Sequence, residues 1–254
     1  MSSIFEYEHI QIPDCKYKIS PSQIGKFFEY PKQWYLENVK KEESEFKGNT
    51  ASFIGTICHY IYSSFVKGIN PTREEINIEL EEYLKEHPNK DVNYHEVTSI
   101  YPQVANAVMN NYVIKHKVDD ISVETPISYK VKEGIYVAGT YDRLEDDILC
   151  DYKHVSSKPN EYVLPFGYRI QLLTYAYILR KLGKEVNKIR IIYGVKPTKT
   201  LNARCFVVTE NVTEDNMKLA EDTLNLIADS IITCNERPEL TYLIFKSMDL
   251  KNEC

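Results

Sequence analysis

The segment from Ile121 to Val155 constrains the fold most, because its polar and apolar side chains alternate with the period of two that β-strands require. It reads ISVETPISYKVKEGIYVAGTYDRLEDDILCDYKHV. Turn residues near Lys132 to Gly134 and at Asp146-Asp147 divide it into three strands, and tight turns join antiparallel neighbours. We therefore expect an antiparallel three-stranded meander.

Helical periodicity dominates the segments on either side of the meander. Ser20 with Gln23 three positions later forms a candidate capping box, and Pro21 suits the first helical position. The expected helices are Ser20 to Leu36, Gly55 to Val66 before Gly68, Thr72 to His87, roughly Tyr94 to Lys117, Phe166 to Leu182 before Gly183, and Asp215 to Thr233; Lys188 to Val195 and Ala203 to Val208 are further strands. This order predicts an α/β fold with one mixed central β-sheet flanked by helices and an N-terminal helical region.

Composition is typical of a globular protein with a packed core. The 254 residues are 43% hydrophobic and 12% aromatic, and no Ser/Gly linker, repeat or single-sign charge block interrupts them. We expect one domain over residues 1–254, with a helical part at about 20–118, the sheet and its helices at about 119–235, and a C-terminal tail at 236–254. Apolar runs are short and broken by charge, so we expect no transmembrane helix, no signal peptide and a cytoplasmic location.

Cysteine spacing and net charge limit the function classes further. The six cysteines contain no CxxC pair or ladder of short spacings, which argues against a disulfide framework or a zinc ribbon. A formal net charge of -6 gives no overall basic footprint for nucleic acid. Any phosphate-binding surface must therefore be a local group of Lys and Arg.

Charge is concentrated where the last two strands of the meander meet, in GTYDRLEDDILCDYK. A two-residue turn at Asp146-Asp147 would pair these strands so that Leu144 faces Leu149 and Asp142 faces Asp151. Directly opposed carboxylates have Cβ atoms about 5 Å apart and repel each other unless a cation lies between them. Mg²⁺ favours carboxylate oxygens, so the hairpin is a candidate metal site.

Strand alternation places Lys153 on the same face as Asp151. In an alternative interpretation, Asp142 pairs with Arg143 or Lys153 as an ordinary solvated strand charge. The stretch Ile148 to Cys150 is apolar on both faces, however, which indicates an inner strand whose charged end is costly to bury unless it has a function. The residues alone favour a metal site over solvated charges.

Four motifs, taken in chain order, resemble those of the PD-(D/E)XK nuclease superfamily, in which an Asp and a D/E-x-K strand hold Mg²⁺. GTYD at Gly139 to Asp142 and DYK at Asp151 to Lys153 are similar to the signature itself. GTICH at Gly55 to His59 and QLLTY at Gln171 to Tyr175 resemble the G-x-x-x-H and Q-x-x-x-Y helices of the RecB-like branch. SPSQIGKFFEYPKQWYL at Ser20 to Leu36 is similar to the helix that opens many RecB-like and CRISPR-associated nuclease domains.

The resemblance spans roughly Ser20 to Val195 and implies a restriction-endonuclease-like core. It implies a Mg²⁺- or Mn²⁺-dependent deoxyribonuclease, an exonuclease acting on single- or double-stranded DNA in recombination, repair or phage DNA processing. No GxxxxGK[ST] motif accompanies it, so a helicase partner would be a separate chain. Tyr30 precedes Pro31 where iron–sulfur members place a Cys, and Cys234 and Cys254 lie far apart, so no iron–sulfur cluster is expected.

The resemblance also assigns roles to individual residues. Asp142 and Asp151 would bind the metal through carboxylate oxygens, and the backbone carbonyl of Tyr152 would be a third ligand. Lys153 would position or deprotonate the attacking water and offset phosphate charge in the transition state. His59 would add an imidazole ligand, which permits Mn²⁺ as well as Mg²⁺. Without the resemblance, a lone His on an apolar helix is more often a structural residue.

Other assignments have open alternatives. Gln171 and Tyr175 share one helical face and would hold the DNA backbone or order the site, although Tyr175 could equally face the core. Glu124 lies on the first strand of the meander, where some relatives place another acid, and could equally be a surface acid. Many relatives have an acid one turn after the histidine, where this chain has Ser63. The expected phosphate contacts are Lys158, Arg169, Lys196, Lys199 and Arg204, and the expected stacking residues are Tyr168, Tyr175 and Tyr177; each could be an ordinary surface or core residue.

Two functions of other classes compete with the nuclease. One is a catalytically silent DNA-binding or assembly subunit that keeps the fold, but the intact Asp142, Asp151 and Lys153 argue against it. The other is a structural domain of a larger complex with a tyrosine-rich surface as its interface, which the 20 tyrosines permit.

Overall fold

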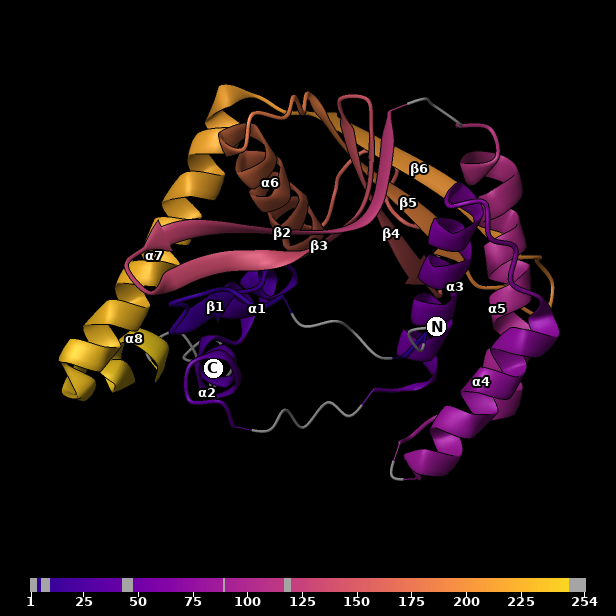
Figure 1. Ribbon diagram of the computed structural model, residues 1–254, viewed down its shortest axis with the longest axis horizontal. Coiled ribbons are helices and arrows are strands. Elements are labelled where there is room, and N and C mark those ends of the chain that lie inside the picture. The colour runs from indigo at the N-terminus through magenta and orange to yellow at the C-terminus, as the bar shows by residue number, and fades with distance from the viewer. Residues whose placement is uncertain (1–3, 6–9, 43–47, 89, 117–119, 247–254) are drawn as a thin grey trace.

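A mixed β-sheet forms the centre of the computed structural model, which describes residues 4–5, 10–42, 48–88, 90–116 and 120–246 (Figure 1). Within these residues, six strands follow the order β1-β3-β4-β5-β6, and β2 pairs with β3. The strands are β1 (Tyr17–Ile19), β2 (Ile121–Lys132), β3 (Ile135–Glu145), β4 (Ile148–Val155), β5 (Lys188–Val195) and β6 (Arg204–Asn211). The antiparallel meander of β2, β3 and β4 is confirmed, and so is the α/β class.

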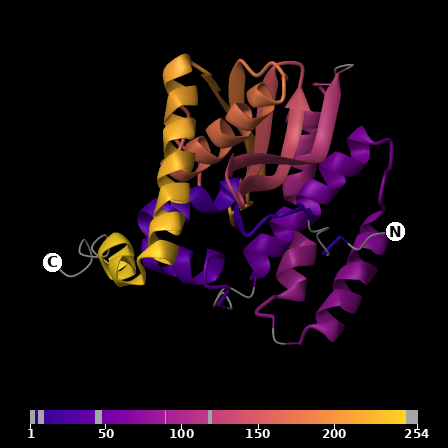
Figure 2. The same cartoon turned by 60° about the vertical axis from the view of Figure 1, so that its left-hand side comes forward.

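Helices cover both faces of the sheet, as the views in Figure 1 and Figure 2 show. One layer contains α1 (Ile24–Glu29), α2 (Pro31–Asn38), α6 (Phe166–Lys181), α7 (Glu214–Glu236) and α8 (Thr241–Lys246). The other contains α3 (Thr50–Val66), α4 (Arg73–Glu86) and α5 (Tyr94–Val108), which continues as a π-helix over Met109–Val113. Single 3₁₀ turns, Pro21–Gln23 and Pro238–Leu240, precede α1 and α8.

Strand β4 separates two hydrophobic cores, which explains why its sequence is apolar on both sides. Leu149 belongs to the core beneath α6 and α7, whereas Cys150 and Tyr152 belong to the core beneath α3 and α5. β4 runs parallel to β5 along its whole length, and α6 makes the crossover between them. The expected inner strand is confirmed, and it brings Asp151 between the two helical layers.

Side-chain caps start α3, α4, α5 and α7. α3 begins after Asn49, whose Oδ1 accepts a hydrogen bond from Ser52 N (3.0 Å) while Ser52 Oγ accepts one from Asn49 N (2.9 Å). Thr72 caps α4 in the same reciprocal way. Gly68 and Gly183 follow α3 and α6 with φ of +76° and +82°, as glycine C-caps require.

The prediction of a single helix from Ser20 to Leu36 is wrong in two respects. Ser20 makes no side-chain cap, and its Oγ lies 3.1 Å from Ser22 Oγ instead. The chain turns at Tyr30 (φ -137°, ψ 62°), where α1 ends and α2 begins, because the ring of Pro31 disfavours helical backbone in the residue before it. Periodicity also failed to indicate β1, a strand of three residues that pairs in parallel with the start of β3.

Several element boundaries differ from expectation. α3 begins at Thr50, five residues before the expected Gly55. β6 runs on to Asn211 because its last residues still pair with the start of β5. α7 is extended at both ends and runs over Glu214–Glu236. Residues 241–246 of the expected tail form α8, where the ring of Phe245 stacks on Tyr35. Residues 247–254 of that tail, like Lys117 at the expected end of the fourth helix, lie outside the described part of the chain.

The sequence predicts no transmembrane helix and no disulfide framework. No helix in the described ranges is long and apolar enough to cross a membrane. Free thiols are found at every described cysteine, namely Cys15, Cys58, Cys150, Cys205 and Cys234.

Helix α1 approaches α6 so closely that glycine is needed at the crossing. A Cβ on Gly25 would lie 2.9 Å from Cα of Gly167, whereas a Cβ on Gly167 would lie 3.9 Å from Cα of Gly25. We expect Gly25→Ala to lower the free energy of unfolding by about 1–3 kcal/mol, because backbone atoms give way only if the helices separate. Gly167→Ala is the matched control and should be neutral or stabilising. Urea denaturation of both variants checks the prediction, and equal losses of stability would contradict it.

Candidate active site

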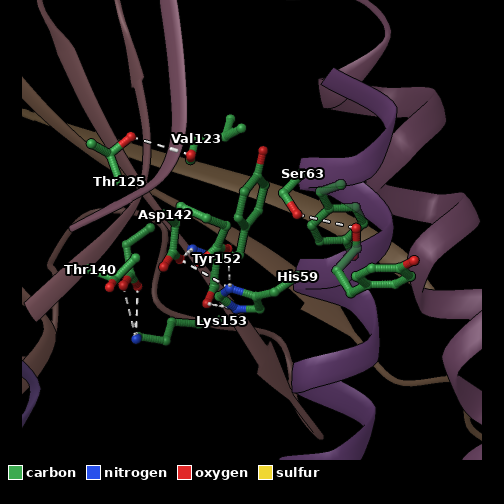
Figure 3. Close-up of polar contacts among 12 residues, drawn as sticks. His59, Ser63, Val123, Thr125, Thr140, Asp142, Tyr152 and Lys153 are labelled. Carbon is green, nitrogen blue, oxygen red and sulfur yellow. Dashed lines mark hydrogen bonds and ion pairs between the residues drawn. The ribbon is translucent and has the colours of Figure 1, made fainter. Parts of the chain in front are cut away.

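Five elements bring the expected site residues together beside the second half of β4. α3 carries His59, β2 carries Glu124 and β3 carries Asp142; β4 carries Asp151, Tyr152 and Lys153; α6 carries Gln171 and Tyr175. In Figure 3, His59 points from α3 toward Asp142 and the backbone of Tyr152. The site therefore depends on packing of helices from both layers against one strand.

The hairpin that carries both aspartates pairs as expected only near its turn. Residues 143–145 pair with residues 150–148 in the expected register, and the ladder ends there. The expected direct opposition of Asp142 and Asp151 is therefore not part of the ladder, because β4 continues alongside β5 while β3 follows β2. Asp142 Oδ2 instead accepts a hydrogen bond from Tyr152 N at 2.7 Å. This bond holds the Asp142 carboxylate against β4 at the point where the two strands separate.

A distortion of β2 turns Glu124 toward the site. The residues on either side of Glu124 pair with β3 in one continuous register, but Glu124 itself is skipped by the pairing and has φ of +45°. Left-handed backbone in a non-glycine residue costs on the order of 1 kcal/mol, so the surrounding strands impose it. Glu124 falls at the register position of Asp142, and its carboxylate lies beside His59. The sequence left open whether Glu124 is a site residue or a surface acid, and the structure places it beside His59.

His59, Glu124 and Asp142 form a first group of contacts. His59 Nδ1 lies 3.5 Å from Asp142 Oδ2 and 3.6 Å from Glu124 Oε1, and His59 Nε2 lies 3.1 Å from the carbonyl oxygen of Tyr152. One ligand atom from each of the three side chains lies within 4.8 Å of the others. Burial lowers the pKa of His59, but the carboxylates of Asp142 and Glu124 outweigh burial and raise this pKa to about 9. In the absence of a cation, the imidazolium therefore balances the two carboxylates.

Asp151, Lys153 and Gln171 form a second group. Asp151 Oδ1 accepts hydrogen bonds from Lys153 Nζ (3.0 Å) and Gln171 Nε2 (2.9 Å). Asp151 Oδ2 lies 2.9 Å from the same ammonium, yet this buried oxygen has no hydrogen-bond partner among the residues that the structure describes. Burial raises the pKa of Asp151 to about 6; Lys153 opposes the rise and Asp142 adds to it. Asp151 Oδ2 is thus ion-paired with Lys153 but accepts no hydrogen bond, so it has lone pairs with which it could bind a metal cation.

Tyr175 supports the site from inside the core. Its side chain is buried, and its hydroxyl donates a hydrogen bond to the carbonyl oxygen of Thr140 at 2.9 Å. Glycine is needed next to it, since a Cβ on Gly139 would lie 2.4 Å from the Tyr175 hydroxyl oxygen. Tyr175 therefore orders β3, and one turn earlier on α6 Gln171 orders Asp151.

The turn of α3 that follows His59 carries no acid. Ser63 is buried there, and its hydroxyl donates a hydrogen bond to a carbonyl oxygen of its own helix at 3.2 Å. Glu124 from β2 occupies the space beside His59 instead. Behind the imidazole, His154 Nε2 lies 3.2 Å from the hydroxyl of Tyr62, and burial holds the pKa of His154 well below its ordinary value. His154 is therefore neutral and adds no charge to the site.

Two of the five residues expected to contact phosphate, Arg169 and Lys158, lie outside these groups. Arg169 forms a bidentate ion pair with Glu210 of β6, with N–O distances of 2.8, 2.9 and 2.5 Å. Lys158 Nζ lies 2.6 Å from Glu161 Oε1. Both cations are paired with acids that the sequence analysis did not consider, and their contact with DNA stays a prediction.

The tyrosines expected to stack bases have different environments. Tyr177 is buried, and its hydroxyl donates a hydrogen bond to Glu221 Oε1 at 2.8 Å, so it cannot stack a base in this conformation. Tyr168 is half-buried, and the ammonium of Lys153 lies 5.0 Å from its ring centroid. Of the three, Tyr168 alone is both partly exposed and adjacent to the site.

Comparison with known proteins finds two similar solved structures and one matching family. The crystal structure of a candidate exonuclease from Eubacterium rectale is similar, with a TM-score of 0.54 and 16% identity, covering 86% of this chain and 81% of that chain. The crystal structure of SSO0001 has a TM-score of 0.35 and 15% identity, covering 86% and 79%. A search of curated proteins finds no match. The family model of the PD-(D/E)XK nuclease superfamily matches residues 18–238, most of the chain, and so the chain belongs to the PD-(D/E)XK nuclease superfamily.

Proposed function

We propose that this chain is a divalent-metal-dependent deoxyribonuclease that hydrolyses phosphodiester bonds from a DNA end. One arrangement carries the proposal: the three-donor group of His59, Glu124 and Asp142 lies next to Asp151, which keeps an oxygen without a hydrogen bond beside Lys153. Buried acids of this kind cost stability and cluster at functional sites. The assignment as an exonuclease rests on the resemblance of the four motifs to those of exonuclease-like members of the superfamily.

The donor set fits Mg²⁺ or Mn²⁺. Glu124, Asp142 and Asp151 would hold the cation through carboxylate oxygens, Tyr152 through its carbonyl oxygen, and His59 through an imidazole that Mn²⁺ accepts more readily than Mg²⁺. When bound, such a cation supplies Lewis-acid activation of water and of the phosphate.

Lys153 supplies positive charge beside the reacting phosphate. Burial lowers the pKa of Lys153, but Asp151 and Asp142 outweigh burial and raise this pKa above its ordinary value. In the metal-free protein the side chain is therefore an ammonium at neutral pH, which donates hydrogen bonds to water or phosphate. Of its two expected roles, this supports positioning of water and compensation of charge over deprotonation.

Gln171 keeps Asp151 oriented for binding. The amide nitrogen donates to Asp151 Oδ1 at 2.9 Å, and the amide oxygen accepts a hydrogen bond from Lys153 Nζ at 3.3 Å. These bonds occupy Oδ1 and leave Oδ2 as the oxygen available to a ligand. Partners of this kind fix the geometry of a ligand before the metal binds.

Digestion of end-labelled linear DNA and closed circular DNA, each single- and double-stranded, tests the proposal. We expect cleavage in Mg²⁺ or Mn²⁺ and none in EDTA. Asp142→Asn and Lys153→Ala should each lower the rate by about 10²-fold or more, because each removes charge that stabilises the transition state. Release of label from linear DNA with circular DNA left intact identifies an exonuclease.

Asp229→Ala is the matched control, because Asp229 is an exposed acid on α7 that pairs with Lys132 away from the site. Its rate should equal that of the wild type. If the folded wild-type protein binds the cation but cuts none of these substrates, the proposal is overturned in favour of a silent DNA-binding or assembly subunit. A role in recombination, repair or phage DNA processing and a separate helicase stay predictions.

A further inference from the structure

Four aromatic side chains lie exposed around the start of α6: Phe28, Tyr30, Tyr162 and Phe166, called the aromatic ledge below. Their exposed fractions are 36%, 53%, 91% and 47%. Phe28 and Phe166 meet edge to face, with ring centroids 5.5 Å apart. Tyr30 follows Phe28 at the end of α1, and Tyr162 precedes Phe166 in the loop between β4 and α6. Phe28 and Phe166 thus form an exposed ring pair, and Tyr30 and Tyr162 lie within a few residues of it along the chain; exposed apolar groups of this kind mark places where a ligand binds.

The loop that carries Tyr162 is anchored at both sides of this residue. Asn160 Oδ1 accepts a hydrogen bond from Tyr162 N at 2.8 Å, and Lys158 pairs with Glu161 at 2.6 Å. Leu164, two residues after Tyr162, is buried in the core beneath α6. The almost fully exposed ring of Tyr162 therefore projects from a loop whose backbone is held in place.

Helix α6 connects the aromatic ledge to the candidate active site. Phe166 is the first residue of α6, and Gln171 follows five residues later, a separation of about 7.5 Å at the helical rise of 1.5 Å per residue. Tyr168 lies between them, with Lys153 Nζ 5.0 Å from its ring centroid. A strand whose phosphate contacts Lys153 can therefore place its neighbouring bases on the ledge.

We propose that the aromatic ledge stacks the unpaired bases of a single-stranded DNA segment adjacent to the phosphate that is cut. The inference rests on the proposed nuclease function and narrows its substrate to single-stranded or frayed ends. Bases within a duplex are covered on both faces by their neighbours, whereas unpaired bases leave a face open for aromatic stacking. Because every base has a π-face, the ledge binds without a strong sequence preference.

The position and chemistry of the ledge favour nucleic acid over a protein partner. Phe166 of the ledge lies two residues before Tyr168, whose ring centroid is 5.0 Å from the ammonium of Lys153. The loop that bears Tyr162 also contributes Lys158, whose ammonium is half-exposed and can follow the phosphate backbone. Stacking rings next to cations are the combination that single-stranded DNA requires.

Fluorescence anisotropy of labelled oligothymidylate measures the stacking directly, with Asp142→Asn as the parent protein so that the strand is not cut. In this parent, Tyr162→Ala and Phe166→Ala should each weaken binding of oligothymidylate by about fivefold or more. Binding of a duplex of the same length should change by less than about twofold. An abasic strand of the same length keeps the phosphates and loses the bases, so neither substitution should alter its binding.

Leu182→Ala is the matched control, because Leu182 is 54% exposed at the opposite end of α6 and should leave all affinities unchanged. Tyr162→Ala removes a side chain that is 91% exposed, so its effect cannot come from misfolding. If the ledge variants bind oligothymidylate as the parent does, or if the parent binds none, the ledge is not a base-stacking surface and fits a protein partner instead. Metal-dependent cleavage by the wild type would still stand in that case, which separates failure of the ledge from failure of the nuclease.

Discussion

Asp151→Asn is expected to lower DNA cleavage by about 10³-fold or more and, in metal-free protein, to raise the free energy of unfolding by on the order of 1 kcal/mol. Activity is lost because the substitution removes a carboxylate from the proposed ligand set and leaves Lys153 without its partner. Stability rises because burial and the nearby Asp142 disfavour the charged form of Asp151 more than Lys153 favours it. The amide of Asn keeps an oxygen for Gln171 and removes the charge.

The gain in stability should depend on pH. The pKa of Asp151 rises from its ordinary 3.8 to about 6 in the folded protein because burial disfavours the charged form. Between these pH values the folded protein holds a proton that the unfolded chain has lost. The wild type therefore has a stabilising contribution that is complete below about pH 4 and lost as the pH rises through about 6. Asn has no proton to lose, so Asp151→Asn does not share this decline, and its advantage over the wild type should develop between these two pH values and persist at pH 7.

Urea denaturation in EDTA at pH 4 and pH 7, together with the cleavage assay in Mn²⁺, measures both effects. Asp222→Asn is the matched control, because Asp222 is an exposed acid that pairs with Lys218 one turn away on α7. It should change the free energy of unfolding by less than about 0.5 kcal/mol at either pH and leave cleavage intact. Retained cleavage by Asp151→Asn would remove Asp151 from the proposed site, and a loss of stability at pH 7 would show that its charge is well satisfied without metal.

The sequence predicts the parts of the site that depend on local geometry. Strand alternation places Asp151 and Lys153 on one face, and the contacts of Lys153 Nζ with both oxygens of Asp151 confirm this. Helical spacing places Gln171 and Tyr175 on one side of α6, and both point toward the sheet. Tyr30 before Pro31 is a local signal of a helix boundary, whereas the capping pattern and the periodicity from Ser20 to Leu36 predict one continuous helix.

Other parts of the site depend on distortion and on long-range packing, which local patterns do not encode. The register between β2 and β3 shifts by one residue between Lys130 and Lys132, close to the turn that joins the two strands. Counting back from that turn therefore does not predict which residue of β3 lies opposite Glu124. The positive φ of Glu124 has no glycine or turn signal to announce it. Arg169 and Glu210 are separated by 41 residues, and their ion pair exists only because α6 packs near β6. Sequence alone therefore overstates how many cations are free to contact phosphate.

The same hairpin also holds a buried charge cluster that serves the fold. Glu145 is 3% exposed and Arg143 is fully buried. Glu145 Oε2 accepts a hydrogen bond from Arg143 Nε at 2.8 Å, and Glu145 Oε1 contacts Arg190 Nη1 at 2.7 Å and the hydroxyl of Tyr112. Arg143 Nη2 also donates to the carbonyl oxygen of His116. One carboxylate thus joins β3, β5 and the π-helix that follows α5.

Glu145→Ala is expected to lower the free energy of unfolding by about 3–5 kcal/mol, because it leaves two guanidinium groups buried or half-buried without their shared partner. For a chain of this size the melting temperature should fall by roughly 10 °C. Glu145→Gln keeps an acceptor for Arg143 and should fall between the alanine variant and the wild type. Thermal unfolding followed by circular dichroism measures all three proteins.

Glu210→Ala supplies the matched control for Glu145→Ala, since Glu210 also pairs with an arginine, Arg169, but both side chains are about 30% exposed. Water replaces the lost partner there, so the expected loss is about 1 kcal/mol or less. Equal losses for the two variants would show that burial does not set the strength of the Glu145 cluster. If Glu145→Ala instead abolished cleavage without lowering the melting temperature, the cluster would belong to the chemistry of the site and not to the fold.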